Sequence, residues 1–138
     1  MHTETNIKGK SILYIVSLPR SGSTLLQKVL VNHSGAKSIP ESWFLLKSMV
    51  GLRGVCEWKS NFGAKACYNA LVDFEKVIGC NLVKAHFDLY RNLLNNLDGS
   101  VFIEKTPRNY LIINEIIDNL RSEDQVILLR RDSRDVFI

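Results

Sequence analysis

The sequence predicts an α/β protein in which helices cover both faces of a parallel sheet, giving three layers. Apolar runs typical of buried strands occur at residues 12–16, 101–103 and 126–129, and stretches with helical spacing of apolar residues separate them. A polar or charged cluster follows each run. Because parallel α/β sheets bind ligands at the carboxyl ends of their strands, the three clusters are expected to converge on one crevice.

The composition fits a single domain over residues 1–138. Of its 138 residues 46% are hydrophobic, which is enough for a core. Its net charge of +4 comes from scattered Lys and Arg, which indicates a pocket for a small anion and no nucleic-acid partner. Cys56, Cys67 and Cys80 match no metal-ligand spacing, so we expect reduced thiols and a cytoplasmic protein. No apolar run is long enough to predict a membrane span.

The elements follow in order from the same signals. Residues 1–10 form a polar lead-in to the strand at 12–16, and the next helix runs to about His33 and ends at Gly35. Residues 36–39 predict a short second strand. A helix is then expected to begin at Pro40-Glu41-Ser42, because proline is tolerated and acids are favoured in a first turn. Its apolar face comprises Trp43, Leu46, Met49 and Val50.

The second half of the chain continues the alternation. Residues 51–63 predict a loop, and helical spacing recurs over 64–78 and 82–97, with glycines shortly after each stretch. After the strand at 101–103, a helix is expected over about 109–121. Its inward residues are predicted to be Tyr110, Ile113, Ile116, Ile117 and Leu120. The strand at 126–129 is the last element.

The turn between the first strand and the first helix has the composition of a phosphate-binding loop. A helix that begins near Gly22 presents unpaired N–H groups and the positive end of its dipole to an anion. Gly22 also lets an anion approach the backbone closely. Further donors come from the side chains of Arg20, Ser21, Ser23 and Thr24. We therefore predict that this loop binds a phosphate.

The loop differs from the nucleotide-triphosphate pattern G-x-x-x-x-G-K-[ST] at two positions. Gly22 and Thr24 fit, but Ser23 stands where the lysine belongs and Ser17 where the first glycine belongs. These positions handle a triphosphate and its metal, so a mononucleotide phosphate is expected, with Arg20 as the cation. A P-loop kinase or nucleotidase remains the alternative enzyme class.

Residues 18–26, Leu-Pro-Arg-Ser-Gly-Ser-Thr-Leu-Leu, resemble the 5'-phosphosulfate loop of sulfotransferases that use 3'-phosphoadenosine 5'-phosphosulfate (PAPS). The arginine form of the loop is similar to that of tyrosylprotein sulfotransferases and their bacterial relatives. Residues 131–136 resemble the family's 3'-phosphate motif, Arg-Asp-Pro-Arg-Asp-Val, with Arg131 as the matching arginine and Ser133 in place of proline. The motif's later serine would fall at 139, so the resemblance implies the N-terminal portion of a P-loop-like sulfotransferase fold.

This resemblance implies transfer of a sulfuryl group from PAPS, without a metal, to a hydroxyl or amine of a small molecule, sugar or peptide. Glu41 follows Arg20 at the spacing of the catalytic glutamate in the tyrosylprotein branch, and a carboxylate can accept the acceptor proton. Lys105 matches the family lysine that neutralises charge on the leaving oxygen, a role that Arg20 would share.

Other interpretations of these residues stay open. Glu41 can be a first-turn acid favoured by the helix dipole, and Lys105 and Arg131 can be surface cations. His86 is the rival base, but it lies on the apolar stripe of a predicted helix, which favours a core position. A truncated, non-catalytic domain that binds a nucleotide is the remaining alternative.

Overall fold

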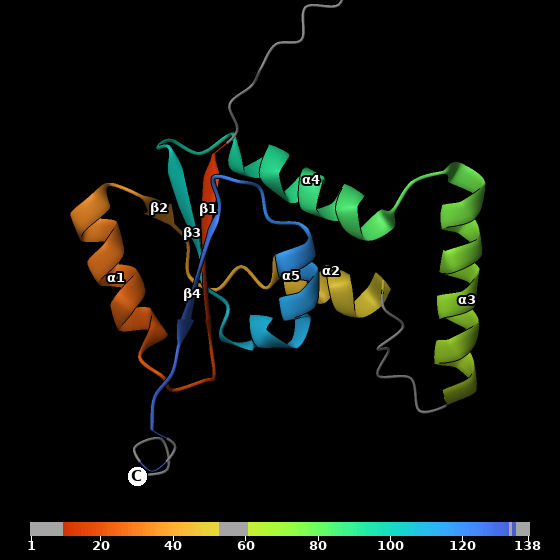
Figure 1. Cartoon of the computed structure of the whole chain (residues 1–138), viewed down its shortest axis with the longest axis horizontal. Helices are drawn as coiled ribbons and strands as arrows, with labels where there is room; N and C mark the ends of the chain where they lie inside the picture. Colours follow the sequence, from red (N-terminus) through yellow and green to blue (C-terminus); the bar gives the residue numbers. More distant parts are fainter. Residues whose placement is uncertain (1–9, 53–60, 133, 135–138) are drawn as a thin grey trace, which may run out of the picture.

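The computed structural model describes residues 10–52, 61–132 and 134, and within them four parallel strands form one sheet in the order β2-β3-β1-β4. The strands are β1 (Ser11–Ser17), β2 (Lys37–Ser38), β3 (Val101–Glu104) and β4 (Gln125–Leu129). All four run in one direction, so their carboxyl ends lie at one edge of the sheet (Figure 1).

Helices cover both faces of this sheet, which confirms the predicted three-layer α/β class. Figure 1 shows α1 (Ser23–Ser34) on one side, and α2 (Phe44–Leu52), α4 (Leu82–Leu94) and α5 (Ile113–Asp118) on the other. A 3-10 helix, η1 (Pro107–Ile112), precedes α5, and α3 (Asn61–Ile78) stands at the far side of α2 and α4.

The alternation of side chains along β1 divides the core in two. Ile12, Tyr14 and Val16 are buried against α2, α4 and η1, whereas Ile15 is buried toward α1 with Ile103. Successive strand residues point to opposite faces, so one strand supplies both layers of packing. β1 is thereby fixed at the centre of the sheet, and the loop that follows it has a rigid base.

Most elements lie where the sequence predicts them. The α1 helix is followed by Gly35, whose φ of 65° is the left-handed conformation that glycine adopts readily after a helix. The helix expected over 109–121 differs, because its first two turns form the 3-10 helix and only 113–118 are α-helical. Tyr110 and Ile117, expected to point inward, are exposed. A 3-10 helix has three residues per turn, which shifts the side chains away from the α-helical face.

Glu41 does not stand at a helix start, which corrects the sequence expectation. α2 begins at Phe44, and Trp43 immediately before it has a left-handed backbone with φ of 56°. This conformation interrupts a right-handed helix, so Pro40, Glu41 and Ser42 form an irregular segment between β2 and α2.

β4 lies at the edge of the sheet and is held by a buried ion pair. Arg91 of α4 donates to both carboxylate oxygens of Asp124, which precedes β4, and Asp124 Oδ1 also accepts from the Ile12 backbone N–H at 2.8 Å. Val126 and Leu128 are exposed, unlike the apolar residues of β1 and β3. The ion pair therefore attaches β4 to the rest of the fold, a role that apolar packing has for the inner strands.

Three sequence expectations concern segments at the limits of the described residues. Cys67 and Cys80 are free thiols, while Cys56 and residues 53–60 of the predicted 51–63 loop lie outside the described residues. The two ends of that predicted loop are helical instead, because α2 continues to Leu52 and α3 begins at Asn61. No described helix combines the length and apolar character needed to cross a membrane.

Candidate functional site

The loop between β1 and α1 leaves the first helical turn open toward an anion. Gly22 occupies the N-cap position with φ of 89°, no described side chain caps the helix, and its first turn holds no acid. Arg20 also has a left-handed backbone, with φ of 67°. The N-terminal amides and the positive end of the α1 dipole are therefore available to a ligand.

Hydroxyl groups surround this open helix end. Ser21 and Ser23 are buried beside Gly22, and the Ser17 Oγ atom at the end of β1 is buried without a hydrogen-bond partner among the described residues. Buried hydroxyls are normally paired, so an unpaired one at a candidate site is compatible with a ligand acceptor. The donor set suits a phosphate group.

Lys105 joins this loop to the segment that carries Glu41. The Lys105 side chain follows β3 and is only 3% exposed. Its Nζ atom donates to Glu41 Oε1 at 3.0 Å and to Thr24 Oγ1 at 3.3 Å. Two of the three clusters that the sequence predicted to converge, and the Glu41 segment with them, thus meet at one ammonium group.

A second set of hydrogen bonds ties α1 to the backbone ahead of Glu41. Gln27, which is buried on α1, donates to the Ile39 carbonyl at 3.0 Å and also to the Ser38 hydroxyl. Ser38 Oγ in turn donates to the Ile103 carbonyl at 2.7 Å. The path of the chain from β2 to Glu41 is therefore fixed to both neighbouring elements.

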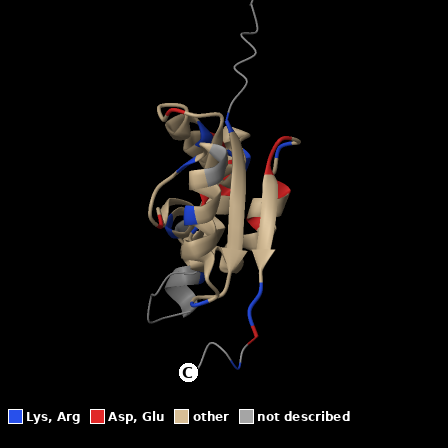
Figure 2. Cartoon of the chain, turned by 90° about the vertical axis from the view of Figure 1, so that its left-hand side faces the viewer, with Lys and Arg blue, Asp and Glu red and all other residues tan. Residues whose placement is uncertain are grey.

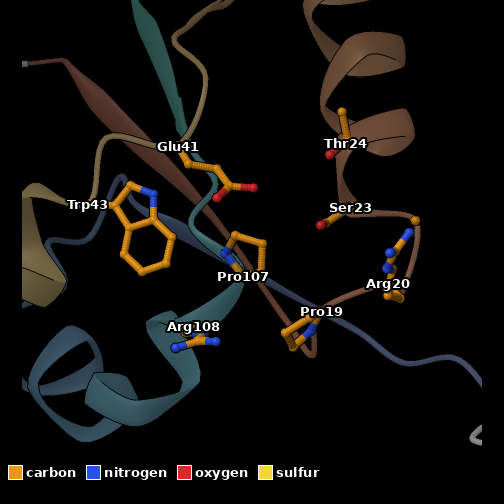
Figure 3. Close-up of a pocket in the computed structure, with 9 residues that line it drawn as sticks. Pro19, Arg20, Ser23, Thr24, Glu41, Trp43, Pro107 and Arg108 are labelled. Atoms are coloured by element: carbon orange, nitrogen blue, oxygen red, sulfur yellow. The ribbon is translucent and has the colours of Figure 1, made fainter. Parts of the chain in front are cut away.

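A cavity of about 480 Å³ opens in front of these groups (Figure 3). Figure 3 shows Arg20, Ser23 and Thr24 on the loop side and Trp43 on the opposite side, with Glu41 and Pro107 between them. The nine lining residues are Pro19, Arg20, Gly22, Ser23, Thr24, Glu41, Trp43, Pro107 and Arg108. The cavity thus has one half bordered by the loop and another bordered by an indole ring, and Glu41 stands at their boundary.

A further cavity, of about 720 Å³, lies along α1 on the other side of the Lys105–Glu41 pair. Thr24 and Glu41 line both cavities, while Lys105 and Gln27 line this one. The pair therefore stands between two openings, from either of which a ligand can reach Glu41.

Arg131 reaches the loop from the end of β4. Its Nη1 atom donates to the Arg20 carbonyl at 3.4 Å, and its side chain is exposed. Figure 2 shows basic residues directly after β4, at the carboxyl edge of the sheet. Arg134 pairs with Asp132 at 2.7 Å, and Ser133 between them lies outside the described residues. The three predicted clusters therefore do meet at one edge.

Glu104 is a buried acid of the site for which sequence reasoning gave no role. It is the last residue of β3, is 2% exposed, and accepts hydrogen bonds from four described side chains. Its position in the sequence could have indicated such a role, because an acid at the end of an apolar, buried strand is itself expected to be buried and must then be hydrogen-bonded.

His86 does not line the cavity, but it is half-buried and does not occupy the core position that its place on the apolar stripe favoured. It is not among the residues that line the 480 Å³ cavity, and its ring stacks on Phe44 with 5.3 Å between ring centroids. Burial lowers the pKa of His86 below its usual value, so the imidazole is neutral at pH 7. The described residues include no cluster of three or more His, Cys, Asp or Glu side chains arranged to hold a metal.

Comparison with known proteins gives one match. A family model described as the sulfotransferase family matches residues 13–138, which is most of the chain and includes most of β1, the loop and β4. No curated protein and no solved structure matches the chain.

Proposed function

This chain belongs to the sulfotransferase family, and we propose that it transfers a sulfuryl group from PAPS to a hydroxyl or amine acceptor. The observation that carries the proposal is the position of Lys105 Nζ, within hydrogen-bond distance of both Glu41 and Thr24. One cation is therefore shared by an anion-binding loop and a candidate base, which is the arrangement that group transfer between two bound molecules needs.

The loop residues supply the proposed donor site. The amides at the start of α1, with the side chains of Arg20, Ser21, Ser23 and Thr24, would hold the 5'-phosphate of PAPS, and Gly22 leaves room for it. Arg131 would bind the 3'-phosphate, since it already reaches the Arg20 carbonyl. The fit rests on an uncapped helix end and on buried hydroxyls beside it.

Glu41 would act as the general base. PAPS supplies an activated sulfuryl group whose S–O bond to phosphate breaks as the bond to the acceptor forms, and the electron pair leaves on the phosphate oxygen. Glu41 would take the proton of the acceptor, and Lys105 and Arg20 would stabilise the charge that develops on the leaving oxygen. The roles need no metal, because fixed cations already face the loop.

The acceptor is proposed to approach from the half of the cavity that Trp43 and Arg108 border. Glu41 separates this half from the loop, so an acceptor group bound there would lie next to the carboxylate. The class of acceptor is a small molecule, sugar or peptide, as for the tyrosylprotein-like and bacterial relatives that the loop resembles.

A donor comparison tests this function. The protein is incubated with PAPS and a mixed set of phenol, alcohol, sugar and amine acceptors, and in parallel with ATP and Mg²⁺, and products are identified by mass spectrometry. We expect a mass increase of one sulfuryl group with PAPS alone. Phosphorylated product with ATP and Mg²⁺, and none with PAPS, would favour the kinase alternative.

A further inference from the structure

Glu104 is a buried carboxylate whose described partners are all neutral. Ser42 Oγ and the Tyr90 hydroxyl donate to its Oε2 atom, the first at 3.1 Å. Thr106 Oγ1 and Asn109 Nδ2 donate to Oε1 at 2.8 and 3.2 Å. No described Lys, Arg or His forms an ion pair with Glu104. A buried carboxyl group is costly unless its oxygens are hydrogen-bonded, so four side chains converging on one acid indicate that the fold or the site needs an acid here.

Two of these donors are the immediate chain neighbours of the candidate catalytic residues. Ser42 follows Glu41, and Thr106 follows Lys105. The other two anchor the cluster, because Tyr90 belongs to α4 and Asn109 to η1, where the Asn109 N–H also donates to the Thr106 carbonyl at 2.9 Å. One carboxylate therefore joins the Glu41 segment, the Lys105 segment and two helices.

The Glu41 segment depends on this attachment more than a helical segment would. Glu41 lies in irregular backbone ahead of α2, next to the left-handed Trp43, so no regular hydrogen-bond ladder sets its position. Ser42 attaches this segment to two elements, since its hydroxyl donates to Glu104 of β3 and accepts from the Phe44 N–H at the start of α2, at 3.3 Å.

We propose that Glu104 is a positioning residue that holds Glu41 and Lys105 in register with each other, an inference that rests on the proposed sulfotransferase function. The Glu104 side chain acts through Ser42 and Thr106, since its described hydrogen bonds include neither Glu41 nor the Lys105 ammonium group. Its effect is geometric: a displacement of about 1 Å at reacting groups can lower a rate on the order of 100-fold.

Three variants of the full chain separate positioning from a purely structural role. Glu104→Ala removes the acceptor, and Glu104→Gln keeps its shape. The amide can replace the carboxylate because the Ser42 and Tyr90 hydroxyls accept hydrogen bonds as well as donate them. Leu94→Ala is the matched control, since Leu94 is buried in the same core on α4 and its apolar side chain forms no hydrogen bond with Glu104.

We expect Glu104→Ala to lower kcat about 100-fold while the Kd for adenosine 3',5'-bisphosphate stays within about threefold of the parent, because the loop is not bonded to Glu104. Glu104→Gln should retain kcat within about fivefold, and Leu94→Ala should lower the melting temperature without a comparable loss of kcat. Amide hydrogen exchange should rise in residues 40–44 and 105–109 of Glu104→Ala, but not in residues 20–26.

Several outcomes would overturn the inference. Unchanged kcat in Glu104→Ala would do so, as would equal loss of kcat in Leu94→Ala, which would mark a general effect of stability. A Glu104→Gln variant as impaired as the alanine variant would show that the charge, rather than the geometry, matters. If the parent protein neither binds the bisphosphate nor transfers sulfate, the proposed function fails. The positioning role of Glu104 is tested independently by hydrogen exchange: unchanged exchange in residues 40–44 and 105–109 of Glu104→Ala would contradict it.

Discussion

Lys105 Nζ lies 3.0 Å from Glu41 Oε1, and the two side chains differ sharply in exposure: 3% for Lys105 and 34% for Glu41. The lysine is enclosed between the loop and β3, while the carboxylate keeps one side open to the cavities. An acceptor can therefore reach Glu41 without displacing Lys105. Lys105 in turn faces the position where negative charge would develop at the loop.

Replacement of Glu41 by glutamine should remove the proposed base. We expect kcat to fall by about 10²-fold or more, since general base catalysis typically contributes that much, while the Kd for adenosine 3',5'-bisphosphate changes little. Steady-state kinetics and calorimetry measure the two effects. His86→Gln serves as the control, because His86 does not line the cavity and its replacement should leave kcat unchanged. The reverse pattern would make His86 the base.

Replacement of Lys105 by methionine keeps the length of the side chain but removes its charge. We expect kcat to fall on the order of 100-fold, the usual effect of losing one group that stabilises developing charge. Lys84→Met is the matched control, because Lys84 forms an exposed pair with Asp88 on α4 and should be neutral for turnover. Equal kcat values for the two variants would remove Lys105 from the proposed mechanism.

Asp124 should make the stability of the fold dependent on pH. Burial by itself raises the pKa of Asp124, but hydrogen bonds from Arg91 and from the Arg121 and Ile12 backbones outweigh it, so the pKa lies below its usual value. A carboxyl with a lowered folded-state pKa stabilises the fold above the unfolded value of about 3.9, and this stability is lost as the pH falls through the folded value.

Asp124→Asn tests that dependence by urea unfolding at several pH values. At pH 7 the variant should lose about 3–5 kcal/mol, the cost of leaving a buried charged partner alone. The difference between parent and variant should shrink as the pH falls below about 3.9. A difference that stays constant between pH 7 and pH 2 would contradict the contribution of the ionised carboxylate.

The sequence allowed the layers and the loop to be predicted because both depend on local signals. The apolar run at 12–16 predicts a strand, and the glycine and hydroxyls at 22–24 predict a phosphate loop, without any knowledge of distant contacts. The backbone of Trp43 could not be predicted, because a left-handed φ at a bulky residue is held by tertiary packing. The Glu104 cluster could not be predicted either, because its donors come from four segments spread over residues 42–109.

The exposure of β4 is a second feature that could not be predicted from the sequence. Residues 126–129 are as apolar as the central strand, so their composition predicts a buried strand. Their position at the edge follows from the order of the strands, which is set by contacts distant in sequence. Hydrophobicity alone therefore identified the strand but not its place.

The binding of adenosine 3',5'-bisphosphate to the Arg20→Ala variant tests the central claim most directly. Alanine and arginine both carry a Cβ atom, so the left-handed backbone at position 20 is equally strained in both, and the comparison isolates the guanidinium group. By calorimetry we expect the parent to bind the bisphosphate and Arg20→Ala to bind it at least about tenfold more weakly, since a hydrogen bond to a charged group contributes roughly 1.5–3 kcal/mol. Equal affinity of the two proteins, or no binding by the parent, would contradict the assignment of residues 18–24 as the 5'-phosphate loop.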